Sequence, residues 1–206
     1  MSSETRRRTP GLAIVLGGIL ALLGGQVREA TGVPTLPFTD NFSASDGSEL
    51  SADWTDRSGN ITIVNGDATG TGHKANLSTL NGLSAADVTV TAGVALAAGE
   101  DVGLVARYSG PLESNFYLGQ LASTPKGFQA TIWKNVGGAL TKLTKGLTVS
   151  SGTGTLTFDI HGSTLTLSLN GSVLTTATDT DLISGSVGLR LGEDATVSSF
   201  EASEPC

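Results

Sequence analysis

From residue 33 onward, hydrophobic and polar residues alternate with a period of two along many short segments. This alternation predicts β-strands that have one buried and one exposed face. In residues 155–161, Leu156, Phe158 and Ile160 are predicted to point one way and the polar residues between them the other. Residues 164–169 repeat the pattern with three leucines, so the two segments are predicted to pair across a common core.

About a dozen such segments follow one another, and turn-forming residues separate them at intervals of roughly 8–12 residues. Asn65-Gly66 and Asn170-Gly171 are strong signals for tight hairpin turns. The pattern predicts an all-β fold, an antiparallel two-sheet jelly-roll sandwich, as a single domain over residues 33–206. The expected strands are residues 36–42, 60–64, 87–96, 102–108, 115–121, 128–135, 140–147, 155–161, 164–169, 172–176, 185–191 and 195–201.

The alternation also assigns side chains to faces of the predicted sheets. One face of residues 128–135 is polar except for Trp133, which makes this ring a candidate binding platform. Arg107 is predicted to share a face with Val105, and Tyr108 to point the other way.

The first 32 residues are predicted to be a signal peptide rather than part of the domain. Residues 6–8 are three arginines, and residues 11–25 form an uncharged apolar run of 15 residues. A membrane span needs about 20 residues. The run fits the helical segment of a secretory signal, with cleavage expected after Gly32. The alternative is an uncleaved signal anchor, which would keep the chain at a membrane.

Charge narrows the range of partners. The 206-residue chain has a formal net charge of −7, and without residues 1–32 it keeps eight basic and 17 acidic residues, a net charge of −9. This balance argues against nucleic acid, whose binding depends on basic residues that neutralise phosphates. It is compatible with an extracellular or cell-surface location. The single cysteine, Cys206, allows no internal disulfide but allows pairing between chains.

Several motifs occur in an order that resembles a known superfamily. The chain resembles the concanavalin A-like lectin/glucanase superfamily, in the form of the laminin-G-like jelly-roll modules of exported bacterial proteins. The resemblance implies a sandwich whose last strand returns beside the first, and it leaves function open because the superfamily includes lectins, glycosidases and structural modules. The segments that carry it are residues 38–42, 58–66, 103–108, 115–118, 165–171, 185–190 and 195–200.

Catalytic chemistry finds little support in the sequence. Glycoside hydrolysis needs two carboxylates that flank the scissile bond. The glucanases that the chain resembles carry them on one strand as Glu-x-Asp-x-x-Glu or Glu-x-Asp-x-Glu, and this sequence contains neither string. Asp159 and His161 share a predicted face, where the carboxylate could orient the imidazole as a base. A solvated polar face is the favoured explanation of this pair, and we expect no enzyme activity.

A sugar-binding site is the more specific expectation. An aromatic ring offers a flat apolar surface to a sugar ring, and Arg or Gln supplies orienting hydrogen bonds. The alternative is structural: Tyr117 and Trp133 cap the edge of the core, and the Arg107 stem packs across the sheet. The candidate ligand-binding residues are Arg107, Tyr117, Gln120, Trp133 and Arg190.

Metal binding rests on the resemblance. Relatives of the fold often hold a structural calcium near the first and last strands, and Asp40 matches the acidic position of the opening element. The acidic residue expected in the last strand is replaced by Ser198-Ser199. A zinc site is disfavoured because the chain has two histidines besides Cys206. We therefore expect no cofactor other than a possible structural calcium with Asp40 as a ligand.

These observations favour a non-catalytic, exported β-sandwich module that binds carbohydrate or another cell-surface component. One alternative is a structural subunit of a cell-surface layer, filament or adhesin that self-associates through Cys206 or strand edges. A second alternative is a degenerate glycoside hydrolase. Four Asn-x-Ser/Thr sequons, at Asn41, Asn60, Asn76 and Asn170, are expected by chance in a chain so rich in Ser and Thr.

Overall fold

The computed structural model describes residues 32–72 and 74–205, and these residues form only strands, turns and loops. There are 16 strands in the described residues. They are β1 (Phe38–Asp40), β2 (Trp54–Ser58), β3 (Ile61–Val64), β4 (Asp67–Gly70), β5 (Asn76–Leu80), β6 (Val88–Ala95), β7 (Asp101–Ser109), β8 (Asn115–Thr124), β9 (Gly127–Val136), β10 (Ala139–Lys142), β11 (Leu147–Val149), β12 (Thr153–His161), β13 (Thr164–Leu169), β14 (Ser172–Thr178), β15 (Ser186–Leu191) and β16 (Thr196–Ser203).

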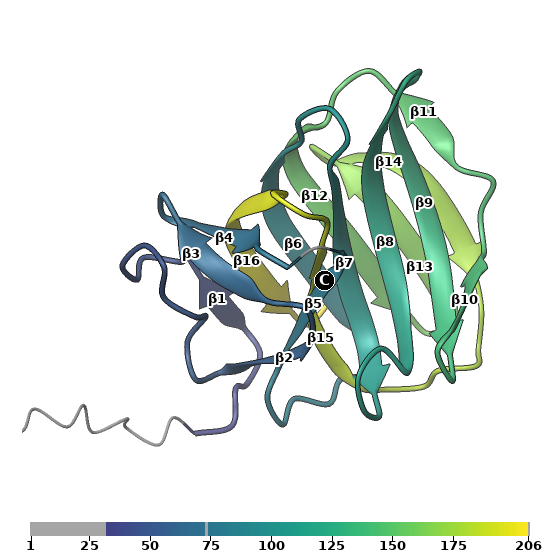
Figure 1. The fold of residues 1–206 in the computed structure, drawn as a ribbon. Helices are drawn as coiled ribbons and strands as arrows, with labels where there is room; N and C mark the ends of the chain where they lie inside the picture. Colours follow the sequence, from purple (N-terminus) through teal and green to yellow (C-terminus); the bar gives the residue numbers. More distant parts are fainter. Residues whose placement is uncertain (1–31, 73, 206) are drawn as a thin grey trace, which may run out of the picture. The chain divides into compact units, whose positions relative to one another are not determined.

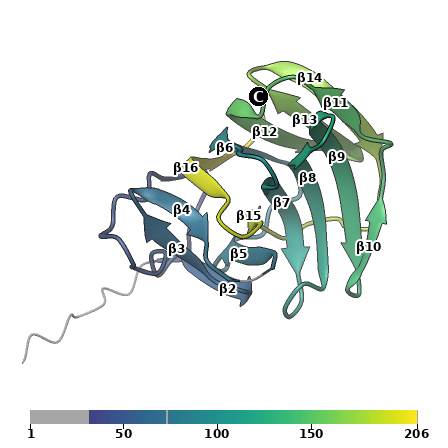
Figure 2. The same cartoon turned by 45° about the horizontal axis from the view of Figure 1, so that its top comes forward.

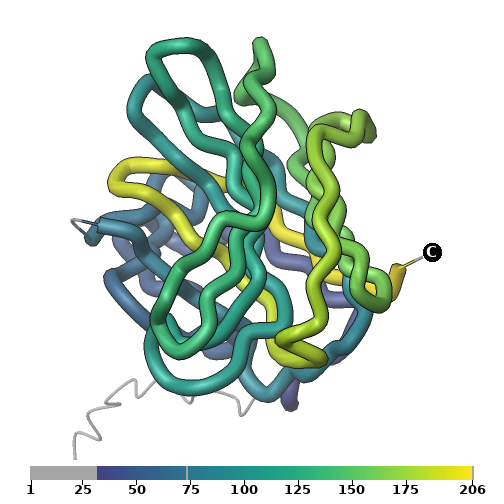
Figure 3. Tube along the Cα trace, turned by 90° about the vertical axis from the view of Figure 1, so that its right-hand side faces the viewer, coloured from purple at the N-terminus to yellow at the C-terminus, as the bar shows by residue number. Residues whose placement is uncertain are grey.

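Two antiparallel sheets of eight strands each make up the predicted sandwich. Sheet A has the order β14-β13-β12-β6-β16-β4-β3, and β1 pairs with β16. Sheet B has the order β10-β9-β8-β7-β15-β5-β2, and β11 pairs with β9. Figures 1 and 2 show β12–β14 behind β7–β10, and Figure 3 shows the same two layers from the side. The pairing of β1 with β16 confirms that the last strand returns beside the first.

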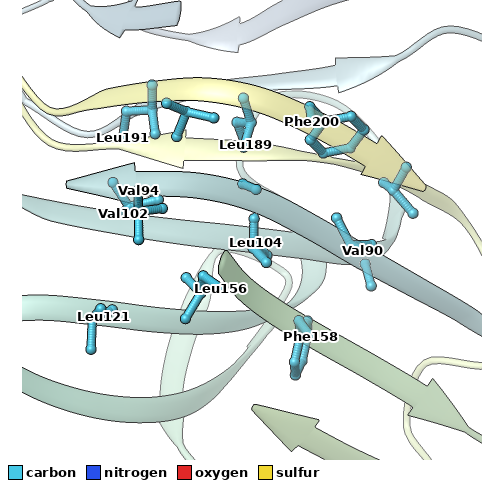
Figure 4. Packing of buried hydrophobic residues seen from close by; sticks show 14 of the residues in the cluster. Val90, Val94, Val102, Leu104, Leu121, Leu156, Phe158, Leu189, Leu191 and Phe200 are labelled. Carbon is cyan, nitrogen blue, oxygen red and sulfur yellow. The ribbon is translucent and has the colours of Figure 1, made fainter. Parts of the chain in front are cut away.

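The core lies between the sheets and consists of the inward halves of the alternating strands. Leu156 and Phe158 of β12 face Leu104 of β7 and Leu121 of β8, and all four are fully buried (Figure 4). The inward set predicted for residues 155–161 is therefore confirmed. Burial of such side chains contributes roughly 1.5–3 kcal/mol each, which makes the core the main source of stability.

The Asn-Gly dipeptides form the tight turns that the sequence predicts. Asn65 and Gly66 have φ angles of 54° and 82°, and Asn170 and Gly171 have φ angles of 51° and 75°. Two consecutive positive φ angles are the requirement of a type I′ turn, whose twist matches that of the flanking strands. These turns connect β3 to β4 and β13 to β14.

Strands β2, β4 and β5 are not among the predicted elements. All five residues of β5 are buried, because Leu80 faces the core while Leu77 lies in a second apolar cluster on the other side of sheet B. A strand that is buried on both faces does not show the alternation that the prediction depends on.

The predicted faces of Arg107 and Tyr108 are wrong. The pairing of β7 with β8 shifts register between Ala106 and Ser109, and Arg107 adopts a φ of 52°. A bulge of this kind adds a residue to one strand and exchanges the faces beyond it. Tyr108 consequently shares a face with Val105, and Arg107 turns towards the space between the sheets.

Some predictions fall outside the described residues. Residues 1–31 of the predicted signal peptide or anchor and Cys206 lie there, whereas Gly32 and Val33, which flank the expected cleavage junction, are described. Within residues 32–72 and 74–205, the structure contains no helix of the length and hydropathy that a membrane span requires.

Candidate functional site

Three of the five predicted ligand-binding residues lie together on the outer face of sheet B, which is turned away from sheet A. Arg190 on β15 and Gln120 on β8 both pair with Gly103, so they flank it in one row across the strands. Trp133 on β9 pairs with Leu118 in the next row. Each of these three has at least one neighbour along its strand in the core, namely Leu121, Ile132, or Leu189 and Leu191, so alternation directs all three outward.

A hydrogen-bonded chain fixes the orientation of the Trp133 ring. The indole Nε1 donates to Gln120 Oε1 at 2.9 Å, and Gln120 Nε2 donates to Asp101 Oδ2 at 2.8 Å. The Lys142 ammonium lies 4.7 Å from the ring centroid, within the range of a cation–π interaction. The ring is half-buried, whereas Lys142 is exposed.

Arg190 forms the polar centre of the opposite half of this face. Its Nε and Nη2 each lie 3.4 Å from Glu113 Oε2. Ser58 Oγ donates to the other carboxylate oxygen at 2.6 Å. The Glu113 carboxylate thereby joins β2 to β15, although it belongs to the loop between β7 and β8.

A second guanidinium reaches the same face because of a bulge in β2. The register between β2 and β5 shifts between Asp56 and Ser58, which directs the adjacent residues Arg57 and Ser58 to one side of the sheet. Arg57 Nε donates to Thr79 Oγ1 at 2.9 Å, and the guanidinium carbon lies 5.1 Å from the Tyr108 ring centroid.

Beneath these polar groups lies a second apolar cluster, consisting of Leu77, Val105, Tyr108, Phe116 and Leu118. All five side chains are buried although they lie on the outer face, because the polar residues and the β7–β8 loop cover them. Beside the cluster is a pocket of about 410 Å³, lined by Pro111, Leu112, Glu113, Ser114, Asn135, Gly137, Gly138, Leu140 and Arg190.

The structure places the other two predicted ligand-binding residues at one end of the sandwich, away from this face. Arg107 is 4% exposed and donates to three backbone carbonyls: Ala86 at 2.7 Å, Leu182 at 2.7 Å and Gly162 at 2.6 Å. Its guanidinium carbon lies 5.9 Å from the Tyr117 ring centroid. These contacts join three separate connections of the fold, so Arg107 has a structural role.

Tyr117 is fully buried and belongs to a polar cluster at the same end. Its hydroxyl donates to Asp179 Oδ1 at 2.6 Å, and Lys134 Nζ donates to Asp179 at 2.5 Å and to Asp181 at 2.6 Å. These hydrogen bonds raise the pKa of Lys134. Burial alone would raise the pKa of Asp179, but the bonds from Lys134, Tyr117 and the Asp181 backbone outweigh it and hold this pKa below its usual value.

This cluster predicts a pH dependence of stability. Because the pKa of Asp179 is lower in the folded than in the unfolded chain, its contribution is present above the unfolded value of about 4 and is lost as the pH falls through the folded value. Asp179→Asn is therefore expected to lower the thermal midpoint at pH 7 and to flatten its decrease between pH 4 and lower values. Thermal unfolding monitored by circular dichroism checks both effects.

Asp181→Asn is the matched control, because Asp181 binds the same ammonium but is 56% exposed, against 11% for Asp179. Solvent screening weakens exposed ion pairs, so this variant is expected to show the smaller change. If the thermal midpoint falls equally steeply below pH 4 in the native chain and in Asp179→Asn, the assignment is contradicted.

Asp40 is held by local contacts. Its Oδ1 accepts from the Phe42 backbone N–H and its Oδ2 accepts from Trp54 Nε1, both at 2.9 Å. Among the described residues there is no group of three or more His, Cys, Asp or Glu that could hold a metal ion. The surroundings of Asp40 therefore supply a structural role for its carboxylate, and calcium at this position stays a prediction.

Asp159 and His161 lie on the outer face of sheet A as predicted, but each has its closest polar contact with another residue rather than with the other member of the pair. Asp159 Oδ1 accepts from Thr89 Oγ1 at 2.5 Å, and His161 Nδ1 lies 3.7 Å from Asp87 Oδ2. The imidazole is thus directed at a different carboxylate from the one that the spacing indicates.

Sequence reasoning missed three residues of the outer face: Arg57, Ser58 and Glu113. Glu113 reads as an ordinary turn residue two positions after Pro111, and the bulge that directs Arg57 and Ser58 to one face has no signature in the alternation. A signal was available in the cluster of charged residues around residues 56–57, but it does not indicate which way they point.

The structure resembles solved β-sandwich proteins. The carbohydrate-binding module CBM66 from Bacillus subtilis matches with a TM-score of 0.61 and 18% identity, over 72% of this chain and 95% of that one. The Ca2+/Man-bound VIP36 exoplasmic/lumenal domain matches with a TM-score of 0.56 and 13% identity, over 74% of this chain and 83% of that one.

The chain also matches part of a longer protein. A mutant of the GH43 protein BlXynB from Bacillus licheniformis matches with a TM-score of 0.58 and 17% identity, over 81% of this chain but only 39% of that protein. No protein-family profile and no curated protein matches the sequence. At these identities the similarities establish the fold, and the function has to be argued from the site.

Proposed function

We propose that the chain is a non-catalytic, exported carbohydrate-binding module whose ligand lies on the outer face of sheet B. The observation that carries the proposal is the Trp133 ring, which is half-buried among polar side chains and oriented by Gln120. An oriented aromatic ring with hydrogen-bonding groups beside it is the usual construction of a site that stacks a sugar. Arg190 and the pocket next to Glu113 extend the surface.

The structural neighbours support the same class of ligand. One of them is described as a carbohydrate-binding module and another as a carbohydrate recognition domain. The carboxylates of the outer face support binding rather than catalysis, because each already accepts a hydrogen bond from a neighbouring side chain. Asp101 accepts one from Gln120, and Glu113 accepts one from Ser58. An exported location rests on the signal peptide predicted for residues 1–32.

Removal of the Trp133 ring is the direct test. Trp133→Ala is expected to weaken glycan binding about 30-fold, since truncation of an aromatic anchor typically costs about 2 kcal/mol or more. A glycan array identifies the ligand, and isothermal titration calorimetry with it measures the loss. Binding of Trp133→Ala within about twofold of the native chain, equal to roughly 0.4 kcal/mol, would place the site elsewhere.

Tyr117→Phe is the control. Tyr117 is a predicted site residue that the structure buries between the sheets, and the change removes only its hydroxyl. This variant is expected to bind glycan as the native chain does while its thermal midpoint falls.

A further inference from the structure

The loop of residues 110–114, here called the strap, lies against the outer face of sheet B. Tyr108 Oη donates to the carbonyls of Gly110 and Leu112, both at 2.8 Å. Asn135 Nδ2 donates to the Glu113 carbonyl at 3.0 Å. Tyr108 and Asn135 belong to β7 and β9, so the strap is held from two strands of this face.

At the end of the strap, the Glu113 carboxylate lies against Ser58 and Arg190, the two groups that an acidic ligand would bind. Glu113 Oε1 accepts from Ser58 Oγ at 2.6 Å, and Oε2 faces both Nε and Nη2 of Arg190 at 3.4 Å. Charge-assisted N–H···O bonds are usually about 2.7–2.9 Å long. The Arg190 contacts are longer than this, which leaves the guanidinium able to form shorter bonds to another carboxylate.

The Arg190–Glu113 pair is accessible from solvent. The side chains of Arg190 and Glu113 are partly buried, 16% and 31% exposed, so solvent reaches the pair and weakens it. Leu112 is 70% exposed and holds a φ of 52°, a left-handed conformation that is unfavourable for a branched side chain. At this residue the strap is therefore held by the hydrogen bond from Tyr108 and not by packing of the Leu112 side chain.

Two further groups beneath or beside the strap have capacity for another polar contact. Asn135 is 3% exposed, and its buried Oδ1 makes no hydrogen bond in the part of the chain that the structure describes. Arg57 contacts Thr79 and the Tyr108 ring, and within the described residues it has no ion-pair partner. Arg57 and Arg190 give this face two guanidinium groups in a chain whose net charge is −7.

We infer that Arg190 and Ser58 form a carboxylate subsite, that Glu113 occupies it when no ligand is bound, and that the ligand is a glycan containing uronic acid. This inference rests on the proposed function, because it names the class of sugar bound on the same face. When the glycan carboxylate binds Arg190 and Ser58, the Glu113 side chain withdraws and the strap moves away from the pocket beside Asn135.

The test compares acidic glycans with their neutral esters. Oligomers of galacturonate, alginate and hyaluronan are titrated by calorimetry beside the methyl esters of the same oligomers, which differ only in the carboxylate. At least one free acid is expected to bind about tenfold more tightly than its ester, in line with a bidentate Arg–carboxylate pair. Glu113→Gln is expected to tighten the free acid about fivefold, and Arg190→Gln to reduce it to the level of the ester.

Glu201→Gln is the charge-matched control, because Glu201 is an exposed carboxylate on β16 of the other sheet. It is expected to leave the affinity unchanged, which separates a local effect of Glu113 from a general change of net charge. The inference is overturned if acids and esters bind equally well, or if dextran sulfate binds and no uronate does. Either result leaves the proposal of carbohydrate binding intact. If no glycan binds, both proposals fail.

Discussion

Arg107→Ala is expected to reduce the free energy of unfolding by about 3–5 kcal/mol, because it leaves several buried groups without partners. The guanidinium donates to the carbonyls of Ala86, Gly162 and Leu182, and all three bonds are 2.6–2.7 Å long. An unsatisfied buried carbonyl costs about 1–3 kcal/mol, and water entering at the end of the sandwich recovers part of the loss. The thermal midpoint should fall by roughly 10 °C.

Urea denaturation monitored by tryptophan fluorescence measures this effect. Arg190→Ala is the matched control, because Arg190 is also a strand arginine but its partner is the partly exposed Glu113. That variant is expected to lose no more than about 1 kcal/mol. Equal losses in the two variants would show that the three carbonyls do not depend on Arg107.

Asn76→Ala is expected to cost about 2–4 kcal/mol, the second largest effect. Asn76 is fully buried, and its Oδ1 accepts from the backbone N–H groups of Asn60 and Gly72 at 2.9 and 3.0 Å. Its Nδ2 donates to the carbonyls of Gly72, Lys74 and Leu191 at 3.3, 2.8 and 3.2 Å. The amide therefore holds the β4–β5 connection against the end of β15.

The packing around Asn76 leaves no space for the chain to adjust. A Cβ atom added at Gly59 or Gly72 would lie 2.3 Å from Asn76 Oδ1, so the two glycines permit the close approach of the backbone. Asn41→Ala is the control, because Asn41 is an exposed sequon asparagine. Urea midpoints of the two variants decide the matter, and an Asn76→Ala chain as stable as Asn41→Ala would contradict the role described here.

The sequence was sufficient to predict the sandwich because its strands are mostly amphipathic. Leu156, Phe158 and Ile160 point inward wherever the strand that carries them pairs, since alternation is a property of the strand itself. The same rule directed Trp133 outward, and the structure confirms that face. The Asn-Gly turns were equally predictable, because few residues tolerate two positive φ angles in succession.

Side-chain partners were not predictable in the same way. Asn76 read as a chance sequon, yet it is buried and makes five hydrogen bonds to the backbone of four residues that lie 2 to 115 positions away. Glu113 read as a turn residue, and its partner Arg190 lies 77 positions away. Contacts of this kind depend on the path of the whole chain.

The sequence by itself determined the fold class, the hairpin turns and the face on which the Trp133 ring lies. Only the tertiary structure decided that Arg107 and Tyr117 lie between the sheets and that Glu113 reaches Arg190. The reason is physical: local periodicity sets the faces of a regular strand, whereas one added residue in a bulge exchanges those faces, and pairing with the neighbouring strands decides where the bulge forms.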